Sequence, residues 1–218
     1  MNYSRRSLLA AGATGGVALT AGCLDFVRGD GPLVLSSEQV RPTEDALEET
    51  EYDEYDIDEQ SMEETIDVGI ERDVEATIWS SVYSKEIDFQ GFEEEACFFA
   101  AISIPDVSVL GYSLNPIEDM DNEELLEEFM GEIDSEHADF DNVSHADSFS
   151  LDILDDSRDV DRFEGETEIA GQQVDVDIGV TSFGHDDDVL VLLSSYPADL
   201  EEESEHAETL MESVEHPA

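Results

Sequence analysis

Apolar and polar residues alternate along most of the chain at the two-residue spacing of β-strands. In the range 174–178, two valines and an isoleucine alternate with two aspartates, which predicts a strand with one buried face and one acidic face. Similar patterns and short apolar runs predict extended segments over residues 33–40, 52–62, 65–68, 74–83, 98–104, 107–110, 148–154, 160–169, 173–181 and 189–195. Gly69 and Gly171 are expected to turn two hairpins.

Apolar residues at three- and four-residue spacing predict helices at three places. Asp121 is followed by an acid three residues on, which matches a capping box, and the apolar positions from Leu125 to Ile133 continue at helical spacing. A short acidic helix is expected over residues 42–50 and a longer helix over residues 198–215. Many strands and few helices predict an α+β fold, a twisted, mainly antiparallel β-sheet with two or three packed helices.

Two stretches of the chain are alike. Residues 64–69 and residues 166–171 each begin a predicted hairpin, and each hairpin is followed by an apolar run that ends in Ser-Ile-Pro or Ser-Tyr-Pro. An old duplication of a hairpin-plus-strand unit explains this likeness. Chance similarity between two hairpins of one sheet explains it equally well.

The beginning of the chain has the layout of an export signal. Arg5 and Arg6 precede an uncharged stretch, residues 7–24, that is rich in Ala and Gly. The arginine pair resembles the twin-arginine class of bacterial and archaeal signals. The stretch runs into Leu-Thr-Ala-Gly-Cys, which resembles a lipobox, in which the thiol of Cys23 is acylated and becomes the first residue of the mature protein.

This leader has two alternative interpretations. Thr20 stands three positions before the cysteine, where an aliphatic residue is usual, and this favours ordinary cleavage and secretion. An uncleaved membrane anchor needs about 20 strongly apolar residues, whereas this stretch carries several glycines. We expect residues 1–22 to be a twin-arginine signal peptide with a lipobox, residues 23–32 a lipidated tether, and residues 33–218 a single acidic α+β domain.

The charge of the chain is strongly one-sided. It has 59 acidic and 8 basic residues, a formal charge of −51, and Lys85 is its single lysine. High charge with low hydrophobicity is typical of disorder, but the regular apolar positions favour a folded domain with an acidic solvent face. At molar salt the screening length falls to about 3 Å, so we interpret the chain as a haloarchaeal protein. Nucleic acid is not expected as a partner, because its phosphates would be repelled.

The residues that carry chemistry do not form a known catalytic motif. The sequence has no Gly-x-Ser-x-Gly elbow, phosphate loop, His-Glu-x-x-His or zinc-binding cysteine pair. Cys97 lies in an apolar run, where a buried free cysteine is typical. With Cys23 lipidated, Cys97 would have no disulfide partner. We therefore expect a protein that is not an enzyme and has no cofactor.

Two loop regions are the candidate binding surfaces. The segment from Pro105 to Pro116 carries Tyr112 and Asn115, and binding residues often lie on such loops. His185 precedes three aspartates, and carboxylates suit Ca²⁺ and Mg²⁺, although the spacing matches no known calcium loop. The default interpretation of this acidic cluster is solvated surface, so no metal ligand is assigned from the sequence.

Taken together, the leader, the box ending in Cys23, the strand over residues 33–40 and the strand-rich end resemble an uncharacterised haloarchaeal lipoprotein family, known only as a domain of unknown function. The last third is similar to Mog1/PsbP-like domains in its order of strands and final helix, and this analogy implies a fold and no function.

The family resemblance implies a location and no activity. The location is the extracytoplasmic face of the cell membrane, where the lipid on Cys23 holds the domain. From the anchor and the missing catalytic motifs, we expect a non-catalytic module that binds an envelope protein. The alternative is a lipoprotein that binds a small solute or a divalent cation.

Overall fold

The computed structural model describes residues 32–67, 71–89, 91–106, 108–109, 112–113, 117, 120–132 and 140–218. The predicted signal with Arg5 and Arg6, the lipidation residue Cys23 and most of the tether lie outside these ranges. The chain divides into two compact units. One comprises Met1–Leu35 and Ser61–Ala76, and the other comprises Ser36–Gln60 and Thr77–Ala218.

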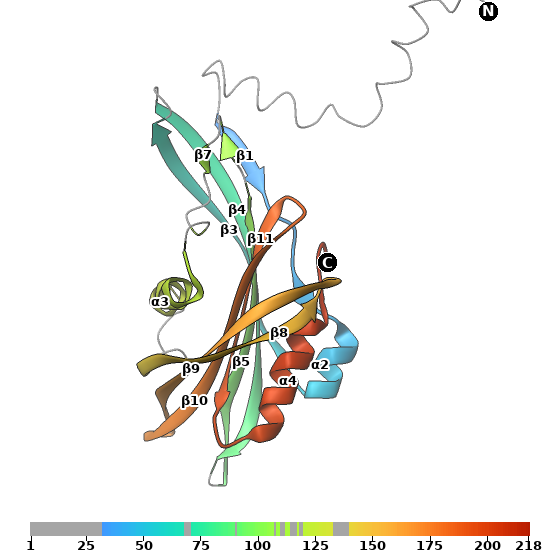
Figure 1. Cartoon of the computed structure of the whole chain (residues 1–218), viewed down its shortest axis with the longest axis vertical. Helices are drawn as coiled ribbons and strands as arrows, with labels where there is room; N and C mark the ends of the chain where they lie inside the picture. The colour runs from blue at the N-terminus through green and yellow to red at the C-terminus, as the bar shows by residue number, and fades with distance from the viewer. Residues whose placement is uncertain are drawn as a thin grey trace, which may run out of the picture. The chain divides into compact units, whose positions relative to one another are not determined.

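Strands make up most of the described residues (Figure 1). They are β1 (Leu33–Ser36), β2 (Arg41–Pro42), β3 (Asp53–Asp67), β4 (Glu71–Phe89), β5 (Phe92–Pro105), β6 (Ser108–Val109), β7 (Tyr112–Ser113), β8 (Asp141–Ile153), β9 (Asp156–Ile169), β10 (Gln172–His185), β11 (Asp188–Pro197) and β12 (Val214–Glu215). The helices in this part of the chain are α2 (Glu44–Thr50), α3 (Asn122–Glu132) and α4 (Glu201–Glu212).

One sheet has the strand order β1-β4-β5-β11-β10-β9-β8, and β3 also pairs with β4. The pairs β4–β5, β5–β11, β10–β11, β9–β10 and β8–β9 are antiparallel. Two short ribbons are formed by β2 with β12 and by β6 with β7. The prediction of a mainly antiparallel sheet with few helices is confirmed, and the share of strand makes the fold mainly β.

The two alike stretches of sequence lie at matching places in the strand order. Residues 64–67 end β3 and residues 166–169 end β9, and each of these strands begins a run of three. The last strands of the two runs, β5 and β11, pair with each other. Because duplication and chance both produce this arrangement, duplication stays a hypothesis.

The central strands β5 and β11 are buried on both faces, which explains their continuous apolar runs. In β5, Phe99 and Ala101 belong to one core, whereas Ala100 and Ile102 belong to the other. In β11 the neighbouring residues 190–193 alternate between the same two cores. The prediction of a buried strand over residues 98–104 is therefore confirmed.

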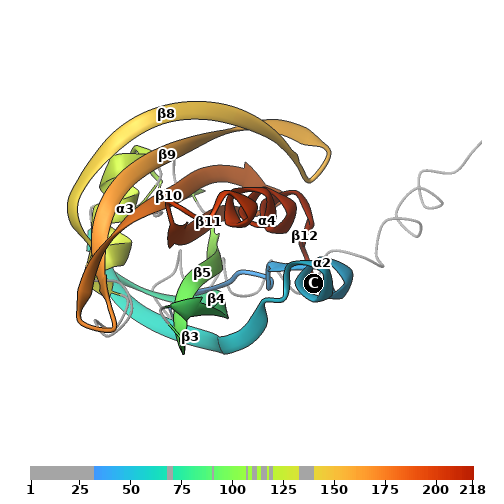
Figure 2. The same cartoon turned by 90° about the horizontal axis from the view of Figure 1, so that it is seen from below.

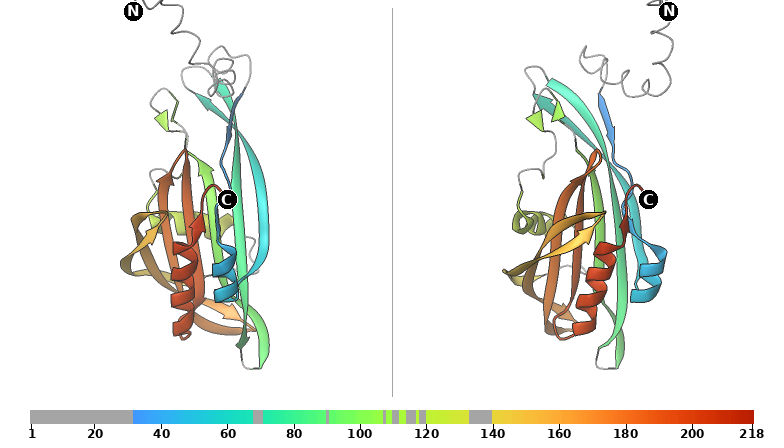
Figure 3. Two further views of the ribbon diagram at one scale, coloured as in Figure 1. Left: turned by 90° about the vertical axis from the view of Figure 1, so that its right-hand side faces the viewer. Right: turned by 45° about the vertical axis from the view of Figure 1, so that its right-hand side comes forward.

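Helices of the second unit cover the two faces of its part of the sheet. Helix α4 packs on β5, β8 and β11 and beside α2, and Leu210 and Met211 are almost fully buried there. A fully buried leucine side chain contributes roughly 1.5–3 kcal/mol. Figure 2 shows β8, β9 and β10 curving over α4, and both views of Figure 3 show α2 beside it. Helix α3 packs on β10 and buries Leu125 and Leu126 in the other core.

The predicted capping box of α3 is confirmed. Asp121 Oδ1 accepts a hydrogen bond from the Glu124 backbone N–H at 2.9 Å, and Glu124 Oε2 accepts one from the Asp121 N–H at 3.2 Å. Two helix-end N–H groups that would otherwise lack partners are satisfied in this way.

Several predicted boundaries were wrong. The strand predicted over residues 33–40 ends at Ser36, and the helix predicted from residue 198 begins at Glu201. The last helix ends at Glu212, and Val214 and Glu215 form β12 because they pair with Arg41 and Pro42 in β2. Strand β8 begins at Asp141, before the predicted start at 148. Its first half is largely exposed and its register with β9 is irregular, so it leaves no alternating apolar pattern in the sequence.

Candidate functional site

Four polar side chains from two distant segments meet at one end of the β10–β11 hairpin. His185 ends β10, Asp186 lies in the two-residue turn, and Asp188 begins β11 opposite His185. Asp186 has a φ of 54°, which aspartate tolerates better than most residues in tight hairpin turns. His216 arrives from the end of the chain.

Backbone hydrogen bonds attach the end of the chain to residues 39–42, next to Glu38, whose N–H contacts Asp188 of this hairpin. Strand β12 pairs with β2, and beyond it the Ala218 N–H donates to the Gln39 carbonyl at 3.0 Å. His216 lies between these two attachments, and its side chain is 1% exposed. One backbone attachment on each side of His216 therefore holds the buried imidazole in place.

Asp188 orients the ring of His216. Its Oδ2 atom accepts from the Glu38 backbone N–H at 2.9 Å and from His216 Nε2 at 3.0 Å. The Asp188 side chain is 6% exposed, so these donors offset the cost of burying the carboxylate. In the neutral ring, a carboxylate acceptor at Nε2 favours the proton on that nitrogen and leaves Nδ1 of His216 as an acceptor.

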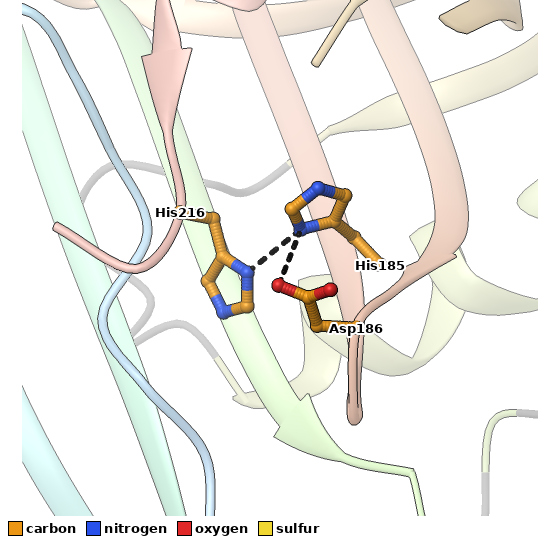
Figure 4. Close-up of side chains that lie close together, drawn as sticks. All are labelled: His185, Asp186 and His216. Atoms are coloured by element: carbon orange, nitrogen blue, oxygen red, sulfur yellow. Dashed lines mark hydrogen bonds and ion pairs between the residues drawn. The ribbon is translucent and has the colours of Figure 1, made fainter. Parts of the chain in front are cut away.

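That lone pair faces a second histidine, as Figure 4 shows. The Nδ1 atoms of His216 and His185 are 3.0 Å apart, and their rings meet edge to face at 71°. Asp186 Oδ2 lies 3.9 Å from His185 Nδ1. One ligand atom from each of the three residues lies within 4.8 Å of the others, a spacing suited to a metal ion.

Exposure gives this group an open side. The side chains of Asp186 and His185 are 71% and 23% exposed, whereas His216 and Asp188 are buried. A solvated ion can thus reach the group from the turn. We name His185, Asp186, Asp188 and His216 the histidine cluster.

A second polar group, the lysine cluster, comprises Lys85, Glu203, His206, Tyr52 and Cys97. Lys85 Nζ donates to Glu203 Oε1 at 2.7 Å and to His206 Nδ1 at 3.2 Å. The Tyr52 hydroxyl donates to Glu203 Oε2 at 3.4 Å. Glu203 is buried and Lys85 is largely buried, with side-chain exposures of 7% and 11%.

Burial makes the thiol of Cys97 and the phenol of Tyr52 hard to ionise. It raises the pKa of the Cys97 thiol to about 12, and the nearby carboxylate of Glu203 acts in the same direction. Burial also raises the pKa of Tyr52, with smaller contributions from Cys97 and Glu203. Cys97 is therefore a neutral thiol in the core, in agreement with the prediction from its apolar run.

The predicted binding residues have different outcomes. His185 lies in the histidine cluster, Tyr112 lies in β7 of the β6–β7 ribbon, and Asn115 lies outside the described residues. The N–H of Asp106 donates to the Asp187 carbonyl at 2.8 Å, so the segment that begins at Pro105 starts beside the His185 turn. His216 was missed, because no local spacing links it to residue 185.

In the described part of the chain, no helix has the length and apolar character needed to cross a membrane.

Comparison with known proteins gives a family and a weak structural likeness. No curated protein matches the sequence. The structure of LpqN, described as involved in cell envelope biogenesis of Mycobacterium tuberculosis, is similar over 78% of this chain and 94% of that chain. At 9% identity and a TM-score of 0.29, this likeness is too weak to show a shared fold. A family match covers residues 39–215 and so includes three members of the histidine cluster and stops one residue before His216. The chain belongs to the family DUF6517, a domain of unknown function.

Proposed function

We propose that this chain is a lipoprotein on the extracytoplasmic face of the cell membrane, where its folded domain binds an envelope protein without catalysing a reaction. The observation that carries the proposal is the order of features along the chain. A twin-arginine-like leader ends just before Cys23, and the first strand begins at Leu33. The nine residues between them reach about 30 Å when fully extended, so the lipid would hold the domain close to the bilayer.

The lysine cluster supports a binding role rather than a catalytic one. A nucleophilic cysteine needs a lowered pKa, and the pKa of Cys97 is raised. The amine of Lys85 is held by Glu203 and His206 and is largely buried. The two most nucleophilic side-chain types in the described residues are thus tied into the core.

The distribution of charge supports a high-salt setting. The single lysine of the chain is inside the fold, while acids such as Glu54, Asp58 and Glu202 are exposed. Loss of Arg5 and Arg6 with the leader would leave 59 acidic and 6 basic residues, a formal charge of −53. Repulsion among surface acids grows as screening falls. Dialysis from molar to millimolar salt should therefore unfold the domain, and native circular dichroism at millimolar salt would contradict the halophilic interpretation.

A cysteine comparison tests the anchor. Cys23→Ser should move the protein from the membrane fraction to the soluble fraction, while the control variant Cys97→Ala should stay with the membrane. Replacing Arg5 and Arg6 with lysine should block export and leave the full-length precursor in the cytoplasm. Membrane retention of a cleaved Cys23→Ser protein would show that the lipid is not the anchor.

Partner binding needs its own experiment. The full-length protein, cross-linked in membranes at growth salt and purified, should bring down the same envelope protein in repeated preparations. The control is a leaderless version kept in the cytoplasm, which should not. Equal recovery of the same proteins with both versions would count against an envelope partner.

A specific observation favours cation binding as a second candidate function. The histidine cluster places two imidazole nitrogens and a carboxylate oxygen around one point. Cation binding is compatible with an envelope partner, because the cluster occupies only one end of the β10–β11 hairpin.

A further inference from the structure

The two carboxylates of the histidine cluster have different hydrogen-bond partners from Glu203, the carboxylate of the lysine cluster. In the lysine cluster, Glu203 accepts from an ammonium group. In the histidine cluster, Asp188 accepts from a backbone N–H and an imidazole, and Asp186 lies against an imidazole. The histidine cluster thus concentrates negative charge and nitrogen lone pairs without a lysine or arginine among these contacts.

The tautomer of His216 prepares it to bind a cation. With its Nε2 proton directed to Asp188, the Nδ1 atom is left as an acceptor. Without an ion, a proton on His185 Nδ1 can donate across the 3.0 Å gap. When His185 instead carries its proton on Nε2, both Nδ1 atoms present lone pairs to the same point. This carboxylate–histidine arrangement recurs around bound metal ions, where the carboxylate orients the ligand ring.

The distances fit a tetrahedral ion after small adjustments. Zinc–nitrogen bonds of about 2.0–2.1 Å place two nitrogen ligands roughly 3.4 Å apart at the tetrahedral angle. The Nδ1 atoms are 3.0 Å apart and must separate by a few tenths of an ångström. Asp186 Oδ2 lies 3.9 Å from His185 Nδ1 and within 4.8 Å of His216 Nδ1, so it must move toward both nitrogens, by about 0.5 Å in the case of His185. Its exposed position on the turn allows that movement.

The ligand types select the class of metal. Ca²⁺ and Mg²⁺ prefer oxygen ligands, whereas Zn²⁺ and neighbouring first-row divalent ions accept imidazole nitrogen with one carboxylate. We propose that His185, Asp186 and His216 bind a zinc-class divalent cation through two Nδ1 atoms and one carboxylate oxygen, with Asp188 orienting His216. Water fills the remaining coordination position from the exposed side of the turn. The ion ties the end of the chain to the β10–β11 hairpin.

Metal titration of the full-length protein, purified in detergent at molar NaCl and stripped with chelator, tests this proposal. Isothermal calorimetry with Zn²⁺ should show one equivalent bound. Co²⁺ should give the intense visible absorption of a tetrahedral nitrogen-and-oxygen site, and Zn²⁺ should displace it. Excess Mg²⁺ should not remove the bound Zn²⁺, whereas ions held loosely by the acidic surface should be released.

Variants locate the site. His185→Gln and His216→Gln should each abolish the cobalt spectrum, and Asp188→Asn should weaken Zn²⁺ binding by about 10- to 100-fold. His145→Gln is the matched control, because this histidine lies on β8 with a 45% exposed side chain that contacts Asp161. Circular dichroism of each metal-free variant checks folding. Since His185 is partly exposed, its variant keeps the test decisive if the His216 variant does not fold.

Three outcomes would overturn the proposal. The first is no Zn²⁺ bound by the folded protein. The second is binding that His145→Gln reduces as much as His185→Gln does. The third is binding that Mg²⁺ removes completely, which would assign it to the acidic surface. None of these outcomes bears on the lipid anchor, which is tested by membrane fractionation of Cys23→Ser.

Discussion

The lysine cluster and the histidine cluster are two solutions to one problem, the burial of a carboxylate beside histidine. Glu203 is neutralised by Lys85, the single lysine of the chain, whose ammonium group lies inside the fold. The cost of burying the Asp188 carboxylate is offset by hydrogen bonds from a backbone N–H and from the ring of His216. The first cluster is closed, whereas the second is open toward Asp186. The difference indicates that the lysine cluster stabilises the core and the histidine cluster can receive a cation.

Removing the ammonium group of Lys85 from the lysine cluster should have the largest effect on stability. Lys85→Met would leave the buried carboxylate of Glu203 without its ion-pair partner. The free energy of unfolding should fall by about 3–5 kcal/mol, measured by urea unfolding at constant molar salt. The double variant Lys85→Met/Glu203→Leu should recover most of this loss, because neither charge then stays buried. A loss below about 1 kcal/mol in the single variant would show that the cluster is not a buried ion pair in solution.

In the histidine cluster, a change at the buried carboxylate should act on metal affinity. Asp188→Asn keeps the size of the side chain and weakens its acceptor for His216 Nε2. A 10- to 100-fold loss of Zn²⁺ affinity corresponds to about 1.4–2.7 kcal/mol, measured by calorimetry. Glu203→Gln in the lysine cluster is the contrasting variant, and it should destabilise the fold with Zn²⁺ affinity unchanged in the protein that remains folded. Equal loss of affinity in both variants would remove the distinction between the clusters.

Alkaline pH should destabilise the fold through Cys97 of the lysine cluster. In the folded protein, burial raises the pKa of Cys97 from 9.0 to about 12. As pH rises above about 9, the thiol of the unfolded chain releases its proton while the folded thiol keeps it. The free energy of unfolding should therefore fall with rising pH, by at most about 1.4 kcal/mol per pH unit for this group, until the folded pKa is reached.

A cysteine variant isolates that contribution. Cys97→Ala should give a flatter decline of unfolding free energy between pH 9 and 12, and the residual slope should include Tyr52, whose pKa is also raised by burial. Urea unfolding at fixed salt and several pH values measures both slopes. Identical slopes in the two proteins would show that the thiol does not titrate with unfolding.

The helix cap at Asp121 should contribute the smallest change in unfolding free energy, against which the other changes can be compared. Asp121→Ala removes the cap of α3 on the opposite face of the sheet, and the expected loss is about 1 kcal/mol of unfolding free energy. Zn²⁺ affinity should not change. If the cap variant costs more than Lys85→Met, the larger stabilising role assigned to the closed cluster is wrong.

Much of the architecture could be predicted from the chain alone. Alternating residues in β10, the continuous apolar run of β5 and the capping box at Asp121 each leave a pattern that is complete within a few neighbouring positions of the sequence. The first half of β8 could not be predicted, because its exposed residues need not alternate. The end of α4 was misplaced because pairing with Arg41 and Pro42 diverts Val214 and Glu215 into a strand.

The sequence by itself determined the alternation of the strands, the helix cap, the acidic surface and the burial of Cys97, because each depends on local spacing or composition. It also identified His185 beside three aspartates as a site to inspect. Only the tertiary structure decided that His216 joins His185, and that Lys85 meets Glu203 across 118 positions. The physical reason is that side chains far apart in the sequence come within bonding distance through strand pairing and helix packing, which leave no mark in the local spacing of either partner.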